Sequence, residues 1–181
     1  MKSKFFIYLF VLAIGIISCS KDDDSNSNNM DSETNTEETI STFSDVEFSL
    51  DDAARFYATS TGKMYGVSGI DSETSKTIDL VGDSNQAFIA FSSPSKADEI
   101  SSGTVTKIQH TNVSMTVTEF DDIKDSKAFM DITVTDDNDS VGLSDYKDNI
   151  ILFENEAGKK GAIKLKAINA TRVLVDIKVV K

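Results

Sequence analysis

Few side chains in this sequence carry the chemistry of a reactive site. The chain has 181 residues with a single cysteine, Cys19, and a single histidine, His110, while 30 residues are Asp or Glu. A thiolate is a nucleophile, an imidazole is a general base near neutral pH, and carboxylates act as acid–base pairs or calcium ligands. One histidine cannot form a histidine-rich metal site, and no Gly-x-Ser-x-Gly motif supplies a serine nucleophile. We therefore expect no catalytic residue, no cofactor and no enzymatic activity.

The acidic segment Asp136–Ser140 is the best candidate for binding a cation, because it places hard oxygen donors in one short loop. Counted from Asp136, the sixth position of an EF-hand loop would be Val141 instead of glycine, and the twelfth Lys147 instead of glutamate. The segment is therefore predicted to be a solvated acidic turn without metal, with an irregular calcium site as the alternative. His110 follows a predicted strand and is expected to lie in a loop that faces solvent.

The cysteine stands at the end of a segment with the features of a signal peptide. Lys2 and Lys4 precede thirteen uncharged, mostly apolar residues, which run from Phe5 to Ile17. A helix of that length is about 20 Å long, well short of the ~30 Å hydrocarbon core of a bilayer. We therefore predict a cleaved signal peptide over residues 1–18, with a retained signal anchor and a free thiol as the alternative.

The end of this segment, Ile16-Ile17-Ser18-Cys19, resembles the lipobox of bacterial lipoproteins. In that family the thiol of the cysteine receives a diacylglyceryl group, and a peptidase cleaves the chain before this residue. Several acyl chains make membrane attachment effectively permanent, because each buried CH₂ contributes about 0.8 kcal/mol. The resemblance implies that Cys19 is the lipidated N-terminus, so that the chain's membrane partner is reached through this covalent lipid.

The residues after Cys19 resemble the surface-export signal of Bacteroidota lipoproteins, in which a serine and a lysine precede two or more acids. They are Ser20, Lys21, Asp22, Asp23 and Asp24. In that phylum the signal directs a lipoprotein across the outer membrane, so the resemblance implies a lipid-anchored protein that faces the cell exterior. A plain solvated linker is the alternative. Asp139-Ser140-Val141 likewise resembles the site at which Bacteroidota O-glycosylate exported proteins, which implies a glycan on Ser140.

Composition divides the mature chain into a polar segment and a folded domain. Residues 20–42 are almost all Ser, Asn, Thr, Asp and Glu, and such a segment buries too little apolar surface to fold. We assign residues 19–43 to a lipidated, disordered tether with a root-mean-square span of roughly 27 Å, and residues 44–181 to the domain. From Phe43 onward, 15 Lys and Arg stand against 23 Asp and Glu, a net charge of −8. The domain therefore lacks the basic surface that nucleic acid or anionic headgroups require.

Apolar residues alternate with polar ones along much of the domain, which is typical of strands with one buried face. The strongest runs are 46–50, 113–117, 130–134, 163–167 and 173–179. Together with shorter runs they predict about nine or ten strands, joined by turns such as the one at 158–161. We predict a mainly β fold, an antiparallel sandwich or barrel-like domain with one or two short helices. One helix should begin after Thr118 as N-cap, and Lys178 should face solvent opposite a buried Ile177.

The body of the domain also resembles small Bacteroidota surface lipoproteins, in residues 58–65, 91–94 and 158–168. This resemblance implies a shared β-domain and no particular activity. Carbohydrate sites usually present exposed aromatic rings, and Tyr57 and Tyr65 are the candidates for such a ligand patch. We therefore expect a non-catalytic binding or adhesion module. The alternatives are a structural surface component without a small ligand and a glycan-binding accessory protein of an outer-membrane uptake complex.

The substitution Cys19→Ala tests the lipid anchor. It should abolish lipid attachment and leave an uncut precursor, because the thiol is the acceptor and cleavage in this family follows lipidation. Labelling cells with a clickable fatty acid, followed by an immunoblot for the precursor, measures both effects. Incorporation of label into the variant at the wild-type level would contradict the assignment of Cys19.

Overall fold

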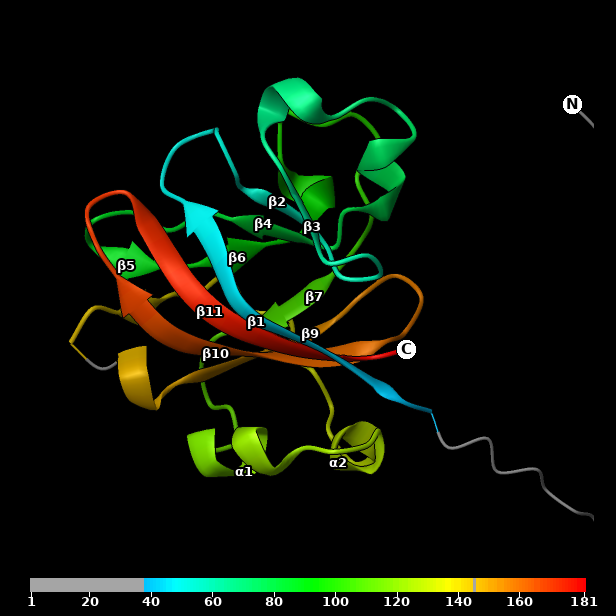
Figure 1. Cartoon of the computed structure of the whole chain (residues 1–181), viewed down its shortest axis with the longest axis vertical. Helices are drawn as coiled ribbons and strands as arrows, with labels where there is room; N and C mark the ends of the chain where they lie inside the picture. Colours follow the sequence, from blue (N-terminus) through cyan, green and yellow to red (C-terminus); the bar gives the residue numbers. More distant parts are fainter. Residues whose placement is uncertain (1–37, 145) are drawn as a thin grey trace, which may run out of the picture. The chain divides into compact units, whose positions relative to one another are not determined.

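The computed structural model describes residues 38–144 and 146–181, which contain eleven strands, two α-helices and four short 3-10 helices (Figure 1). All strand pairs found in these residues are antiparallel. The predicted mainly β, antiparallel fold with short helices is therefore confirmed. The strand orders in this part of the chain are those of open sheets, so no closed barrel is formed.

The largest sheet has five strands in the order β1-β11-β10-β9-β7. Their bounds are β1 Ile40–Ser49, β7 Lys107–Gln109, β9 Ile150–Glu154, β10 Lys160–Ile168 and β11 Arg172–Val180. Strands β9, β10 and β11 are joined by hairpins, as the turn residues predict. In the first of these turns Gly158 adopts a φ of 75°, which glycine reaches without steric cost. Strand β1 pairs with β11 along its length and forms one edge of this large sheet.

Two smaller sheets complete the β structure. The four-stranded sheet has the order β3-β2-β4-β6, and a two-stranded sheet pairs β5 with β8. Their bounds are β2 Phe56–Ala58, β3 Lys63–Tyr65, β4 Leu80–Gly82, β5 Phe88–Ile89, β6 Phe91–Ser92 and β8 Val141–Gly142. The 3-10 helices are Val67–Gly69, Thr74–Thr77, Pro94–Lys96 and Tyr146–Asp148.

The main core lies on one face of the large sheet. Alternate side chains of its strands, such as Ile163 and Val175, share this core with Phe48, Tyr57 and Phe91. Because Tyr57 and Phe91 belong to β2 and β6, the main core joins the large sheet to the four-stranded one. A separate cluster, which includes Phe56 and Val81, covers the outer face of the four-stranded sheet.

The opposite face of the large sheet is covered by helices α1 (Val117–Asp122) and α2 (Lys127–Met130). Leu152 and Ala162 project from this face and pack against Phe120 of α1 and Phe129 of α2. Figure 1 shows both helices beside β10 and β9, on the side away from β2, β3 and β4. The large sheet is therefore buried on both faces, and not on one as the alternation alone would suggest.

The structure corrects two boundaries of the sequence analysis. Strand β1 begins at Ile40, so residues 40–43, which were assigned to the tether, belong to the sheet. Helix α1 has Thr116 as its N-cap in place of Thr118: the Thr116 hydroxyl accepts from the Glu119 N–H at 3.2 Å, and Glu119 accepts from the Thr116 N–H at 2.7 Å. This reciprocal pair is a capping box, which satisfies two backbone donors at the start of the helix.

The strands predicted at 113–117 and 130–134 do not form. Residues 113–116 are irregular and lead into α1, whereas Met130 ends α2 and the chain beyond it is irregular. Their alternate apolar residues Val113, Met115 and Ile132 are partly buried against the helix-side core. A segment that crosses a sheet face buries one side without pairing to a strand, and it therefore shows the same alternation as a strand.

Lys178 is also placed differently from the prediction. It lies on the face opposite Ile177, as expected, but helix α1 covers that face and leaves Lys178 only 8% exposed. Its Nζ donates to three carbonyl oxygens at the end of α1, those of Phe120 (2.9 Å), Asp121 (3.1 Å) and Ile123 (3.0 Å). Burial lowers the pKa of Lys178, and the nearby carboxylate of Asp121 opposes that shift.

Lys160 makes the same kind of contact at the end of α2. Its Nζ donates to the carbonyl oxygens of Phe129 (3.3 Å), Met130 (3.5 Å) and Ile132 (2.5 Å). The last carbonyls of a helix have no intrahelical donor, and helices of six and four residues are too short to be stable alone. Each short helix is therefore held to the sheet by one lysine at its C-terminal end.

Lys178→Met removes the ammonium group and keeps the apolar stem. Because two buried carbonyls and one partly buried carbonyl lose their donor, we expect the free energy of unfolding to fall by about 2–4 kcal/mol. Lys63→Met on β3, where the lysine is exposed, should change it by less than about 0.5 kcal/mol. Urea unfolding of the two variants and the wild type measures the difference. Equal effects of the two substitutions would show that Lys178 contributes no more than a surface lysine.

Candidate functional site

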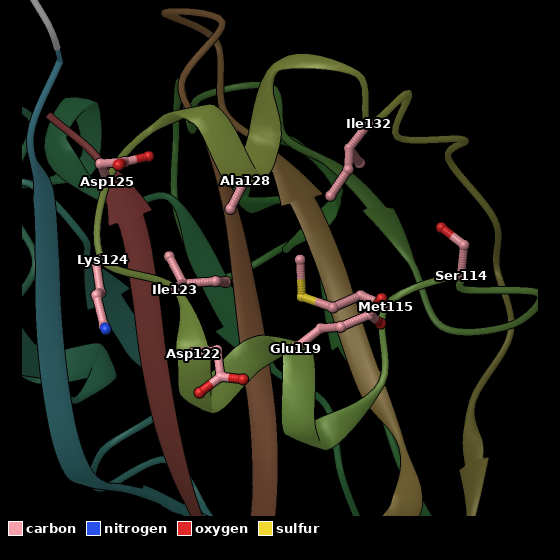
Figure 2. A pocket seen from close by; sticks show the side chains of 9 residues that line it. All are labelled: Ser114, Met115, Glu119, Asp122, Ile123, Lys124, Asp125, Ala128 and Ile132. Carbon is pink, nitrogen blue, oxygen red and sulfur yellow. The ribbon is translucent and has the colours of Figure 1, made fainter.

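An open cavity of about 580 Å³ lies between α1, α2 and the irregular segment that precedes α1. It is lined by Ser114, Met115, Glu119, Asp122, Ile123, Lys124, Asp125, Ala128 and Ile132 (Figure 2). The volume falls within the range of roughly 300–1,000 Å³ that is typical of ligand pockets. We take this cavity as the candidate functional site and call it the helix cavity.

Local sequence explains the walls of the helix cavity. The capping box of Thr116 and Glu119 begins α1, and the N–H of Ile123 closes the helix by donating to the carbonyl of Phe120 at 3.3 Å. The carboxylate of Asp125 then accepts from the Lys127 N–H at 2.9 Å, which turns the chain into α2. Two short helices thus follow each other closely, and their C-terminal ends are bound to the sheet by Lys178 and Lys160.

The floor of the helix cavity is apolar. Figure 2 shows the side chains of Met115, Ile123, Ala128 and Ile132 directed into the space between the two helices. Ile123 is buried, Met115 and Ile132 are half-buried, and Ala128 is exposed, so an apolar ligand that covered this floor would remove its side chains from water.

The rim of the helix cavity is mainly acidic. Glu119 and Asp122 lie on α1, Asp125 precedes α2, and Lys124 is the one basic residue among those that line the cavity. Hydrogen bonds from the backbone N–H and the hydroxyl of Thr116 hold the pKa of Glu119 below its usual value. Glu119 is therefore anionic at neutral pH.

His110 is buried and does not face solvent, which corrects the prediction. Its side chain is 1% exposed, Nδ1 lies 2.8 Å from Oδ1 of Asp137, and the N–H of Phe91 donates to Nε2 at 3.0 Å. Because Nε2 accepts a hydrogen bond, Nδ1 must carry the proton that bridges to Asp137. Both ring nitrogens form hydrogen bonds within the fold, so neither is placed to transfer a proton to a substrate.

The acidic segment Asp136–Ser140 folds back onto the end of β7. Asp136 accepts from the Ile108 N–H at 3.0 Å, and Asp137 accepts from the N–H groups of His110 and Thr111 at 2.9 and 3.1 Å. These carboxylates therefore link two loops, and the segment is only in part the solvated turn that was predicted. Within the residues that the structure describes, no group of three or more His, Cys, Asp or Glu is placed to hold a metal ion. Ser140, the predicted glycosylation site, is exposed.

Tyr57 and Tyr65 do not form the predicted patch. Their strands pair Tyr57 with Met64 and Phe56 with Tyr65, so the two tyrosines project from opposite faces of the four-stranded sheet. Tyr57 is 1% exposed in the main core, where its hydroxyl has no hydrogen-bond partner among the described residues. Burial raises the pKa of Tyr57. Tyr65 is half-buried in the cluster on the other face.

The predicted lipidation and export residues, Cys19 and 20–24, lie outside the part of the chain that the structure describes. Residues 38–144 and 146–181 contain no helix that is long and apolar enough to cross a membrane.

The residues of the helix cavity are not among the site residues that the sequence predicts. One signal was present in the sequence, because Thr116-x-x-Glu119 is the pattern of a capping box and places a helix start at this point. The cavity itself depends on how α1 and α2 lie on the sheet, and no local pattern specifies that arrangement.

Comparison with known proteins identifies a related fold. No family model and no curated protein matches the sequence. The structure is similar to that of a DUF4466 family protein from Parabacteroides merdae ATCC 43184, a crystal structure at 2.00 Å resolution, with a TM-score of 0.55 and 16% sequence identity. The match covers 78% of this chain and 54% of that protein, so this chain spans about half of the other protein's length. At this identity the likeness shows a shared fold.

Asp137→Asn tests the loop contact with His110. An amide has one acceptor oxygen, so its NH₂ group would face N–H donors, and we expect a loss of about 1–3 kcal/mol in the free energy of unfolding at pH 7. Burial opposes ionisation of Asp137, but the hydrogen bonds from His110, Thr111 and Asp139 outweigh it and hold the pKa below its usual value.

The pH dependence of this effect follows from the direction of the pKa shift. A lowered pKa in the folded state stabilises the fold above the unfolded value near 3.8, and the stabilisation is lost as the pH falls through the folded value. The gap between wild type and Asp137→Asn should therefore be constant from pH 5 to 7 and shrink below about pH 4. Urea unfolding across this range measures it, with Asp98→Asn at an exposed site as the control. A gap that does not change with pH would contradict an ionised Asp137.

Proposed function

We propose that this chain is a lipid-anchored, cell-surface binding protein without catalytic activity, and that the helix cavity is its binding site. The observation that carries the proposal is the helix cavity itself, which combines an apolar floor with a charged rim in about 580 Å³. Ligand sites have this composition, because apolar contacts supply affinity and a few polar groups orient the ligand. A purely structural surface component would not require such a cavity.

The anchor is supported by the sequence at the N-terminus. Cys19 directly follows the apolar run, and Ser20 to Asp24 resemble the surface-export signal. Because β1 begins at Ile40, the proposed tether is shorter than the composition alone suggests. Twenty residues separate Cys19 from Ile40, and as a flexible chain they would have a root-mean-square span of roughly 25 Å. The binding site would thus remain within a few nanometres of the outer membrane.

A binding role is favoured over catalysis by the groups that the structure brings together. The one histidine uses both ring nitrogens in the fold, and the one cysteine is the proposed lipid acceptor. The helix cavity contains carboxylates and one lysine, but no histidine, cysteine or tyrosine. A role in glycan binding gains no support from Tyr57 and Tyr65, since their rings lie on opposite faces of a sheet.

The helix cavity can be tested with a small neutral probe. We would place the mature lipoprotein in nanodiscs of phosphatidylcholine, label its methionine methyl groups with ¹³C and titrate isopentanol. The methyl signal of Met115, on the cavity floor, should shift and saturate, whereas that of Met64, on β3, should not. Ala128→Trp should abolish the shift, because the indole ring would fill the space between the helices.

The matched control is Ala170→Trp, since Ala170 is exposed in the turn between β10 and β11. This variant should leave the response of Met115 intact. If the Met115 signal does not shift, or if Ala128→Trp responds like Ala170→Trp, the helix cavity is not a binding site.

A further inference from the structure

We infer that the ligand of the helix cavity is a basic peptide segment, which places one aliphatic side chain on the apolar floor and lysine or arginine side chains at the acidic rim. The inference rests on the proposed function and names the chemistry of the ligand.

The charges at the rim favour a cation. Three acids, Glu119, Asp122 and Asp125, stand against the single base Lys124, and the domain from Phe43 onward has a net charge of −8. An apolar floor next to these carboxylates excludes water from one side and strengthens their field. The rim acids and the net negative charge of the domain would both repel an anionic ligand and attract a cationic one.

Asp122 does not stabilise α1 through the helix dipole. It lies in the last turn of the helix, where the helix dipole disfavours a carboxylate. The preceding residue, Asp121, pairs with Lys164, whereas Asp122 is exposed and is one of the residues that line the helix cavity. Asp122 also favours the charged form of Lys178, and as an exposed carboxylate at the cavity it can in addition attract a cation.

The placement of the acids favours an extended ligand with more than one charge. Glu119 and Asp122 belong to α1, and Asp125 lies in the link between α1 and α2, so the carboxylates occupy more than one position on the rim. A small amine would contact one of these carboxylates. A peptide with cations on either side of an apolar residue could contact more than one, and the stems of lysine and arginine add apolar contact of their own.

Three peptides that differ only in charge test the inference. Each has a central leucine, flanked on both sides by two lysines, two glutamines or two glutamates. They are titrated at low ionic strength against the lipoprotein in phosphatidylcholine nanodiscs, with the Met115 methyl signal as the readout. We expect the Kd of the lysine peptide to be about three- to tenfold lower than that of the glutamine peptide, and the glutamate peptide to bind most weakly. In 0.5 M salt the difference should largely disappear.

The double substitution Asp122→Asn with Asp125→Asn should remove most of the advantage of the lysine peptide. Asparagine at position 125 keeps the side-chain oxygen that accepts from the Lys127 N–H, so α2 should still form. Asp98→Asn removes one exposed charge away from the helix cavity and should leave the advantage in place.

The outcomes separate the two proposals. If the glutamine peptide binds as tightly as the lysine peptide, or if the double variant keeps the full advantage, the cationic ligand is overturned and the helix cavity remains a binding site. If no peptide shifts Met115 but isopentanol does, a peptide ligand is overturned. If isopentanol also fails to shift Met115, the proposed function itself fails.

Discussion

The contact between the Lys178 ammonium and the end of helix α1 is the interaction on which this arrangement depends. The large sheet carries apolar side chains on both faces, so it needs a cover on the face that the four-stranded sheet does not reach. The chain supplies that cover with two helices of six and four residues, which have too few internal hydrogen bonds to be stable in water. Lys178 and Lys160 project from the sheet and donate hydrogen bonds to the carbonyls that each helix leaves without donors. The helices therefore depend on the sheet for their stability, and the sheet depends on the helices to cover this face.

This mode of attachment also explains why a cavity is present. Phe120 and Phe129 pack each helix against the sheet, and the two lysines hold the C-terminal ends. The side chains that α1 and α2 direct toward each other, such as Ile123 and Ala128, are too short to close the space between the helices (Figure 2). The helix cavity is thus bounded by two helices whose C-terminal ends are held to the sheet. A ligand would not need to unfold either helix in order to enter.

Much of the fold could be predicted from local patterns, and the failures have a common cause. The alternation in β10 and β11 and the turn at Gly158 identify the hairpins, because each depends on residues close in sequence. The same alternation in 113–117 and 130–134 predicts strands, yet these segments cross a sheet face without pairing. Period-2 spacing places Lys178 opposite Ile177, but it cannot show that α1, whose Phe120 is 58 residues earlier, covers that face. His110 was misplaced for the same reason, since its partner Asp137 is 27 residues away. The helix cavity depends on the first of these long-range placements, because α1 forms one of its walls.

The acids of α1 connect the binding site to the stability of the fold. Asp121 and Asp122 favour the charged form of Lys178, in opposition to the burial that lowers its pKa. Asp121 also forms an ion pair with Lys164. Asp122 attracts the ammonium of Lys178 and is also one of the acids at the rim of the helix cavity. A cation bound at the rim and the buried ammonium of Lys178 would therefore both be attracted by the Asp122 carboxylate. Three carbonyls already solvate the Lys178 ammonium. Because those carbonyls hold Lys178 independently of Asp122, the rim charge is available to a ligand without release of the contact that holds α1 to the sheet.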